Sequence, residues 1–216
     1  MMDINREHIA SMDKFYRINL INSIAGYKSL NLLGTTSLDG ITNLSIVSSA
    51  FHLGSNPPLL GIVLRPEREH NDTLSNIRDT LHYTLNNVQP EWLNQAHQTS
   101  ASYPSRVSEF DHCGFTKEYV SAFKAPFVKQ SSIRIGLEVR EMIGMEINGT
   151  TIVIGEVIQI LTDSGVIGED GFTDHEKAES IVVSGLDAYY LPKFKVRLPY
   201  AKPGINSSLK SQVHGV

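Results

Sequence analysis

Two strand-like stretches in the second half of the chain, residues 133–145 and 150–161, are separated by the dipeptide Asn148-Gly149. Asn-Gly between two strand patterns is a strong hairpin signal, because the favoured two-residue turn needs a left-handed backbone at both central positions. Asp39-Gly40 gives the same signal between residues 30–37 and the residues from 41 onward. Since a tight hairpin joins antiparallel neighbours, the two dipeptides predict a sheet of antiparallel strands.

Further short strands are predicted around these hairpins, and the expected helices are short. Residues 43–47 and 81–88 alternate in polarity, and residues 59–64 form a continuous apolar run, so all three stretches are typical of strands. Helices are expected over residues 13–24, from Asn71 or Asp72, from Pro90, and over residues 179–190. Many strands and few helices predict a mostly β fold, an antiparallel barrel rather than a parallel α/β sheet.

The chain is expected to form a single domain. Its 216 residues suffice for one sizeable core and are short for two, and no repeat or linker divides them. We place the core at about residues 13–203 and expect the polar tail, residues 204–216, to be loosely ordered. Residues 150–161 are apolar on both strand faces, which predicts burial against another sheet or another subunit.

Charge, cysteine content and hydropathy exclude several classes of partner and site. The net charge is −4 and the basic residues form no stripe, which argues against nucleic acid or an anionic membrane as a partner. Cys113 is the only cysteine, so an intramolecular disulfide, a CxxC redox motif and a multi-thiolate metal site are excluded, and a reducing compartment fits best. The histidines lack metal-ligand spacing such as HExxH. Because we find neither a secretory leader nor a run approaching ~18 apolar residues, we expect a cytoplasmic protein.

The strongest candidate site lies in residues 43–77. Asn43 and Ser45 share one strand face and leave the other face to the core. Ser48, Ser49 and Ala50 then bring small side chains and free backbone N–H groups to a point that a flat molecule can approach. Pro57 and Pro58 stop and turn the chain, and the apolar run that follows ends at Arg65. A helix begins near Thr73, and a helix N-terminus beside an arginine favours a phosphate group.

Each of these residues also has an ordinary structural role open to it. The serines could bond to nearby backbone, and Thr73 could make a local bond in the first helical turn. Arg65 could form an exposed ion pair with Glu67 or Glu69, which is typically worth ~0–1 kcal/mol. Asp72 would oppose a phosphate unless it turns outward as a helix cap.

A second region of interest is residues 98–129, which lack periodicity and are broken by Pro104 and Pro126. A long irregular segment in a compact domain is usually functional or covered by a partner. His97 and Ser100 lie where it begins; a lone histidine is more often structural, and Ser100 is the better candidate for a ligand contact. Cys113 follows an acidic residue, which raises a thiol pKa, so we expect Cys113 to be structural.

Several segments, in this order, resemble the flavin reductase-like FMN-binding split-barrel family. They are YRINLINSIAGYKSLNLLGTTSLDG, NLSIVSSAFHLGSNPPLLGIVLRP, DTLSNI with LHYTLNNV, SEFDHCGFT, APFVKQSSIRIGLE and NGTTIVIGEV. The resemblance covers roughly residues 15–203. It implies a split barrel that binds FMN, with Ser48 and Ser49 in the segment lining the flavin, and with Arg65 and Thr73 in the phosphate region. The full set of expected FMN contacts is Asn43, Ser45, Ser48, Ser49, Ala50, Phe51, Arg65, Thr73 and Ser100.

The resemblance also implies an activity and an assembly. Its members include flavin reductases, in which NAD(P)H passes a hydride to the flavin, so we expect an NAD(P)H-dependent oxidoreductase with no catalytic side chain. Gly165, Gly168 and Gly171 do not form a dinucleotide fingerprint, so NAD(P)H must bind without a Rossmann unit. An electron carrier that does not oxidise NAD(P)H, and a flavin-free binding module, remain alternatives. A homodimer is expected, with residues 98–129 completing the partner's flavin site.

Overall fold

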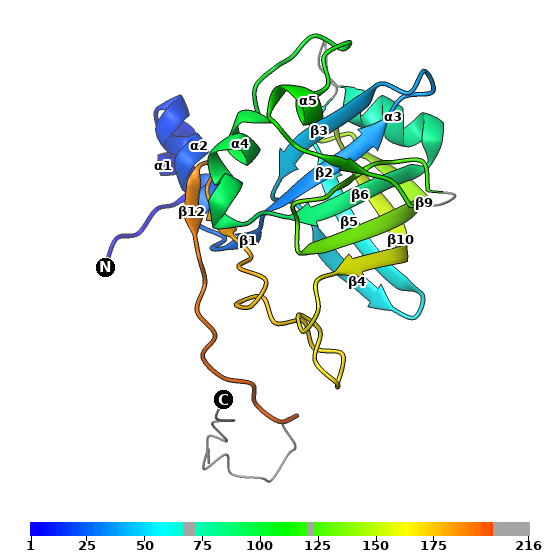
Figure 1. The fold of residues 1–216 in the computed structure, drawn as a ribbon. Coiled ribbons are helices and arrows are strands. Elements are labelled where there is room, and N and C mark those ends of the chain that lie inside the picture. Colours follow the sequence, from blue (N-terminus) through cyan, green and yellow to red (C-terminus); the bar gives the residue numbers. More distant parts are fainter. Residues whose placement is uncertain (67–71, 121–122, 201–216) are drawn as a thin grey trace.

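The computed structural model describes residues 1–66, 72–120 and 123–200, and its main feature is a seven-stranded antiparallel sheet in the order β3-β2-β6-β9-β10-β5-β4 (Figure 1). The mostly β, antiparallel barrel-type fold is therefore confirmed. The strands are β2 (Asn31–Thr36), β3 (Thr42–Val47), β4 (Phe51–Ser55), β5 (Pro58–Leu64), β6 (His82–Asn87), β9 (Ile133–Met145) and β10 (Thr150–Thr162).

Smaller elements flank this sheet. A three-stranded sheet pairs β1 (Lys28–Ser29), β11 (Val182–Ser184) and β12 (Ala188–Tyr190), and β7 (Lys117–Glu118) pairs with β8 (Phe127–Val128). The helices are α1 (Arg6–Ser11), α2 (Lys14–Ser23), α3 (Asp72–Thr80), the 3-10 turn η1 (Pro90–Trp92), α4 (Leu93–Gln98) and α5 (Glu109–His112).

Both predicted hairpins are present. Gly40 has a φ of +81° and joins β2 to β3, while Gly149 has a φ of +71° and joins β9 to β10. Glycine adopts this left-handed backbone without the steric cost that a side chain brings. The two dipeptides therefore place β2 beside β3 and β9 beside β10, as the sequence predicts.

The sheet packs around one large apolar cluster inside the barrel, and a second cluster fills the space under α4 and α5. The first contains Leu33, Ile62, Tyr83 and Val153, all fully buried. The second includes Trp92 and Phe110. Since α3 and α5 both contact β3, the face of β3 that carries Asn43 and Ser45 lies between them.

Two sequence predictions about local structure are wrong. Residues 179–190 do not form a helix; they form β11 and β12, joined by a turn at Gly185 with a φ of +67°. The run Ile181-Val182-Val183 is β-branched, and such side chains pack better on a strand than on a helix. Residues 51–55 form the edge strand β4, which was not predicted and lies between two predicted strands.

Some predictions are confirmed only in part or lie outside the described residues. Helix α2 begins after Asp13, whose carboxylate accepts from the backbone N–H groups of Phe15 and Tyr16, but none of its residues is buried. Residues 98–129 are mostly irregular and contain the short elements α5, β7 and β8. Asn71, the partners proposed for Arg65 and the tail at residues 204–216 lie outside the described residues. No helix in the described part of the chain is long and apolar enough to cross a membrane.

One close approach inside the barrel depends on glycine. A methyl group added at Gly155 in β10 would meet the Tyr83 hydroxyl, with the Tyr83 Cζ at 2.9 Å and the Leu137 Cβ at 3.0 Å. Tyr83 is fully buried, and its hydroxyl has no hydrogen-bond partner among the described residues. Burial also raises the pKa of this phenol, so the hydroxyl stays protonated.

We therefore expect Gly155→Ala to lower the free energy of unfolding by about 1–3 kcal/mol, because the added methyl group overpacks a buried site. Gly144→Ala is the matched control, since Gly144 lies in β9 and has nothing within 4 Å of an added Cβ. Urea unfolding of both variants measures the difference.

Adding Tyr83→Phe to Gly155→Ala removes the hydroxyl that the new methyl group meets, so part of the lost stability should return. Equal stability of Gly155→Ala and Gly144→Ala would show that the barrel accommodates a methyl group beside Tyr83.

Candidate functional site

Asn43 is the centre of a polar network on the face of β3 that the sequence predicts to be free for a ligand. Its Oδ1 accepts from the hydroxyl of Thr73 at 2.9 Å and from that of Thr35 at 3.4 Å. Its Nδ2 donates to the Glu109 carboxylate at 3.0 Å. Asn43 thus connects β3 to β2, to α3 and to α5.

Ser45 and Thr73 meet at the first turn of α3. Their hydroxyl oxygens lie 3.4 Å apart, although 28 residues separate them in the chain. Ser45 follows Asn43 on the same strand face, and Thr73 is the second residue of the helix, so both side chains approach the N–H groups of its first turn. Three of the nine predicted contact residues, Asn43, Ser45 and Thr73, are therefore brought together.

Glu109 holds α5 against the sheet through a buried carboxylate. Its Oε2 accepts from the backbone N–H of Leu44 and from the Asn43 amide, both at 3.0 Å. Burial raises the pKa of Glu109, the nearby charge of Asp72 raises it further, and the hydrogen bond from Leu44 opposes both effects. Beside this contact the hydroxyls of Thr42 and Ser108 lie 2.6 Å apart.

Ser49, Ala50 and Phe51 make packing contacts within the barrel wall. The Ser49 hydroxyl donates to the Val63 carbonyl at 2.7 Å and accepts from the Val63 N–H at 3.3 Å. Ala50 packs against the barrel core, and the Phe51 ring lies where a Cβ on Gly61 would be. Ser49 therefore bonds to nearby backbone, which is the structural alternative to a ligand contact.

The remaining predicted residues occupy more open positions. Ser48 is half-buried in the link between β3 and β4, and Arg65 is exposed just after β5. Ser100 is exposed after α4, and His97 in that helix lies 2.6 Å from the Tyr189 hydroxyl through its Nδ1. Figure 1 shows α4 apart from α3, and among the described residues no hydrogen bond joins His97 or Ser100 to the Asn43 network.

Cys113 is buried, and burial raises the pKa of its thiol. Its Sγ lies 4.0 Å from the Tyr103 hydroxyl. The structural role expected for this cysteine fits a protonated thiol. Burial raises its pKa more than an acidic neighbour does.

A cavity of about 290 Å³ opens beside Asn43, between α3, the β2–β3 hairpin and residues 105–107. Three carboxylates line it, those of Asp39, Asp72 and Asp79, against one guanidinium, that of Arg106. Its wall is therefore mainly acidic, which suits a hydroxyl-rich or cationic group better than an anion.

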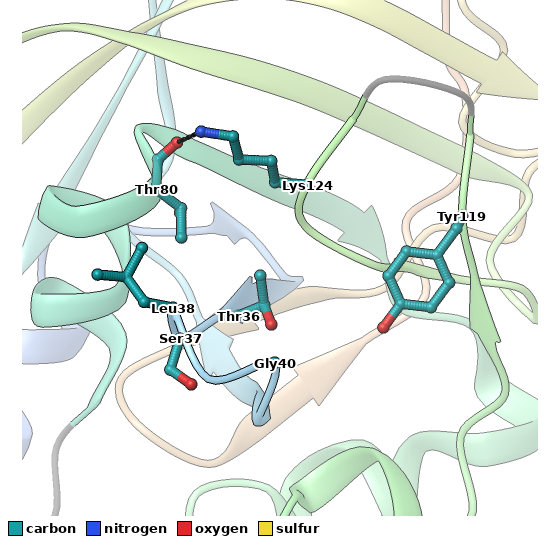
Figure 2. A pocket seen from close by; sticks show the side chains of 7 residues that line it. All are labelled: Thr36, Ser37, Leu38, Gly40, Thr80, Tyr119 and Lys124. Carbon is teal, nitrogen blue, oxygen red and sulfur yellow. Dashed lines mark hydrogen bonds between the residues drawn. The ribbon is translucent and has the colours of Figure 1, made fainter.

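A second cavity, of about 370 Å³, lies on the other side of the hairpin and contains none of the predicted contact residues (Figure 2). Lys124 reaches across it and donates to the Thr80 carbonyl at 3.4 Å. A cation at the C-terminus of α3 complements the helix dipole, which accounts for Lys124 without a ligand.

Sequence reasoning missed Glu109 and the pair Thr35 and Asn76. The Asn76 amide donates to the Thr35 hydroxyl at 3.1 Å and so extends the network along α3. Asn76 follows Thr73 by one helical turn, so the i, i+3 spacing could have placed it on the same helix face. No sequence signal could have paired Glu109 with a residue 66 positions earlier.

Comparison with known proteins identifies related domains. A family model described as "Flavin reductase like domain" matches residues 25–178. A crystal structure from Shewanella frigidimarina, assigned as a flavin reductase with a split barrel domain, is 44% identical, with a TM-score of 0.89 over 93% of this chain and all of that one.

Two more distant structures share the fold. Nitrilotriacetate monooxygenase component B from Bacillus cereus is 18% identical, with a TM-score of 0.79 over 92% of this chain and 98% of that one. Flavoredoxin from Desulfovibrio vulgaris is 20% identical, with a TM-score of 0.70 over 81% of this chain and 92% of that one.

The raised pKa of Glu109 predicts a pH dependence of stability. The ordinary pKa is 4.5, and the folded protein keeps the proton to higher pH than the unfolded chain does. Stability should therefore fall as pH rises from about 4.5 through the folded-state pKa. Glu109→Gln removes this titration, so the stability of the wild type relative to Glu109→Gln should decrease with pH over that range in urea unfolding.

Asp111→Asn is the matched control, because Asp111 lies in the same helix but makes an exposed ion pair with Lys117. A wild-type curve parallel to that of Glu109→Gln would contradict the prediction. Glu109→Ala should cost about 1–3 kcal/mol, because it leaves the Leu44 N–H and the Asn43 amide without an acceptor.

Proposed function

Because this chain belongs to the flavin reductase-like domain family, we propose that it binds FMN and transfers a hydride from NAD(P)H to the flavin. The 44% identical structure from Shewanella frigidimarina, assigned as a flavin reductase, supports this reading. The activity is an oxidoreductase activity in which the side chains bind and orient.

The observation that carries the proposal is the meeting of Ser45 and Thr73 beside Asn43. Ser45 offers a hydroxyl 3.4 Å from that of Thr73, at the first turn of a nine-residue helix whose first N–H groups have no intrahelical acceptor. The Thr73 hydroxyl, which donates to Asn43 in this structure, would turn to a phosphate when one is bound. These residues were chosen from sequence as FMN contacts, and the fold brings them together from separate elements.

The residues present fit FMN in donor type. Ser45 and Thr73 supply hydroxyls, and Arg65 after β5 supplies a cation in the part of the chain that the resemblance assigns to the phosphate. Asp72, in the first turn of α3, has the opposite charge to that expected beside a phosphate. The phosphate therefore needs a cation such as Arg65 to compensate for Asp72.

When bound, FMN would supply the hydride acceptor, which no side chain of this chain provides. The Asn43 amide is held by Glu109 and Thr73, so it is oriented before a ligand arrives. Its position on the half-buried face of β3 would let this amide orient the bound group while the neighbouring core excludes water.

A second candidate function is a flavoprotein electron carrier that does not oxidise NAD(P)H itself. Its support is the fold shared with flavoredoxin from Desulfovibrio vulgaris, at 20% identity. A flavin-free binding module is the remaining alternative, and the acidic cavity beside Asn43 is the feature that favours it.

We also propose a homodimer in the cytoplasm. Support for the dimer comes from β10, where Ile158 and Ile160 are 43% and 52% exposed in the single chain. Completion of the partner's flavin site by residues 98–129 is part of this proposal, because no hydrogen bond among the described residues joins Ser100 or His97 to the Asn43 network of their own chain.

We expect Thr73→Val and Ser45→Ala each to weaken FMN binding about 10-fold or more, because each removes a hydroxyl donor to the phosphate. Ser75→Ala is the matched control, since this exposed hydroxyl in the same helix bonds only the Asp72 carbonyl among the described residues. Fluorescence titration of free FMN measures the affinity.

Arg65→Ala should weaken FMN binding more than either hydroxyl variant, because it removes the compensating charge. Unchanged affinity in Arg65→Ala together with a loss in Thr73→Val would leave the phosphate beside α3 and assign its compensation to another cation. Unchanged affinity in all three variants would overturn the phosphate site.

The proposed activity is tested by mixing the FMN-loaded protein with NADH or NADPH under anaerobic conditions. Loss of the nicotinamide absorbance at 340 nm, with bleaching of the flavin, is the expected result. A protein that holds FMN and leaves both nucleotides unchanged would be the electron carrier. A colourless protein that takes up no FMN would be the binding module.

A further inference from the structure

The two ends of the described chain form one layer, outside most of the range that the family model matches. We call residues 13–29 and 182–200 the terminal layer; it contains α2, β1, β11, β12 and the extended residues 191–200 (Figure 1). Tyr27 and Tyr190 join its halves, with ring centroids 4.8 Å apart, and Lys28 donates to the Gly185 carbonyl at 3.1 Å. The match ends at residue 178, so the layer is mostly an addition to the shared domain.

Helix α2 turns apolar side chains away from its own chain. None of its residues is buried, and Phe15 and Ile24 at its ends are each 71% exposed. An amphipathic helix normally packs its apolar side on the core of its own domain. The apolar side of α2 is therefore available to another surface.

Residues 191–200, which we call the arm, are extended and also turn apolar side chains away from their own chain. Phe194, Val196, Leu198 and Tyr200 occupy alternate positions and are all exposed, with Tyr200 at 91%. Two of the three basic residues on its other side are held by the arm's own chain: Lys193 pairs with Glu176 at 3.3 Å, and Arg197 pairs with Asp170 at 2.6 Å. The arm is thus fixed by its polar side and presents its apolar side outward.

Many large apolar side chains of the terminal layer are exposed. Phe15, Ile24, Tyr27, Leu198 and Tyr200 are each 60% exposed or more. Large apolar side chains exposed together typically mark an interaction surface. The layer is therefore a candidate for one side of an interface.

Charge indicates which surface the layer meets. It carries six basic residues and two acidic ones, although the whole chain has a net charge of −4. If the terminal layers of two copies packed on each other, like charges would meet. If the layer of one copy packed on the rest of a second copy, opposite charges would meet. The remainder of the chain is correspondingly more acidic than the whole.

The outer face of the barrel wall offers a matching surface. Ile152 lies opposite Ile143 and Val63, and Ile154 lies opposite Gly61, which the Phe51 ring covers. Opposed residues share a sheet face, and the alternate residues Val153 and Ile62 are buried in the core, so these side chains point outward. Carboxylates lie on the same face: Glu141 is opposite Ile154, and Glu156 is opposite Glu138.

We propose that the arm packs its apolar side on the outer face of β5, β9 and β10 of a second copy of this chain, and that the second copy returns the same contact. The inference rests on the homodimer proposed above and adds the residues that make it. Two such exchanged contacts satisfy the two-fold symmetry of a homodimer. The basic residue Lys195, for which the described residues offer no ion-pair partner, then faces the carboxylates of the receiving sheet.

The proposal is tested first with the full-length variant Phe194→Ser, Val196→Ser, Leu198→Ser. Its dimer dissociation constant, from sedimentation equilibrium, should rise at least about 100-fold, because three buried apolar side chains are lost from each of two contacts. Leu38→Ser is the matched control, as this side chain is 75% exposed on the β2–β3 hairpin, outside the layer. Unchanged dimerisation of the triple variant would overturn the proposal.

A cross-linking measurement does not depend on the stability of that variant. Protein carrying Leu198→Cys is mixed with protein carrying Ile143→Cys, Ile152→Cys or Ile154→Cys, all in a Cys113→Ser background, and oxidised with copper phenanthroline. A disulfide-linked pair should form in at least one mixture and not in Leu198→Cys protein alone. Absence of such a pair in all three mixtures would overturn the proposed location of the arm.

The oligomeric state and the cross-link, measured together with FMN titration of the same proteins, separate this inference from the proposed function. Dimeric wild type with no cross-link would leave the homodimer and reject the exchanged arm, whereas monomeric wild type would reject both. Binding of monomeric wild type to vesicles of anionic phospholipid, lost in the triple variant, would assign the layer to a membrane surface and overturn the proposal.

Discussion

The buried carboxylate of Glu109 is a contact through which the irregular segment, residues 98–129, is positioned on the sheet. It accepts from the Leu44 backbone and from the Asn43 amide, so it fixes one end of that amide, and the other end is then directed to Thr73. A carboxylate with a raised pKa is costly to bury. This buried carboxylate lies where β3, α3 and α5 meet, which is also where the candidate site lies.

The candidate site and the terminal layer are separate features of the fold. Figure 1 shows α3 and the elements α1, α2 and β12 at opposite sides of the molecule, so the exposed apolar side chains of the layer do not serve the Asn43 network of their own chain. One feature is polar and inside the range of the family model; the other is apolar and mostly outside it. The two features therefore occupy different parts of each chain.

Local signals predicted the fold well, and contacts between distant residues were where prediction stopped. Asp39-Gly40 and Asn148-Gly149 fix turn geometry within a few residues, so both hairpins were readable. For residues 179–190, the β-branched run Ile181-Val182-Val183 was outweighed by a pattern that also suited a helix. The pairing that decides the matter joins Val182 to Ser29 of β1, 153 positions earlier in the sequence.

The candidate site shows the same division. Asn43 and Ser45 were placed on one strand face by alternation alone, and Thr73 by the helix start, but the 3.4 Å approach of Ser45 to Thr73 required the fold. Ser49 was chosen for its small polar side chain, and the structure uses it to bond the Val63 backbone. Residue type could not separate these two uses, because a hydroxyl serves a ligand and a backbone carbonyl equally well.

Charge decides which part of this region suits a phosphate. The cavity beside Asn43 is walled by Asp39, Asp72 and Asp79, and a dianion placed there would face three carboxylates against the single guanidinium of Arg106. Neither Ser45 nor Thr73 is among the residues that line this cavity, so the phosphate site proposed above does not require the anion to enter it.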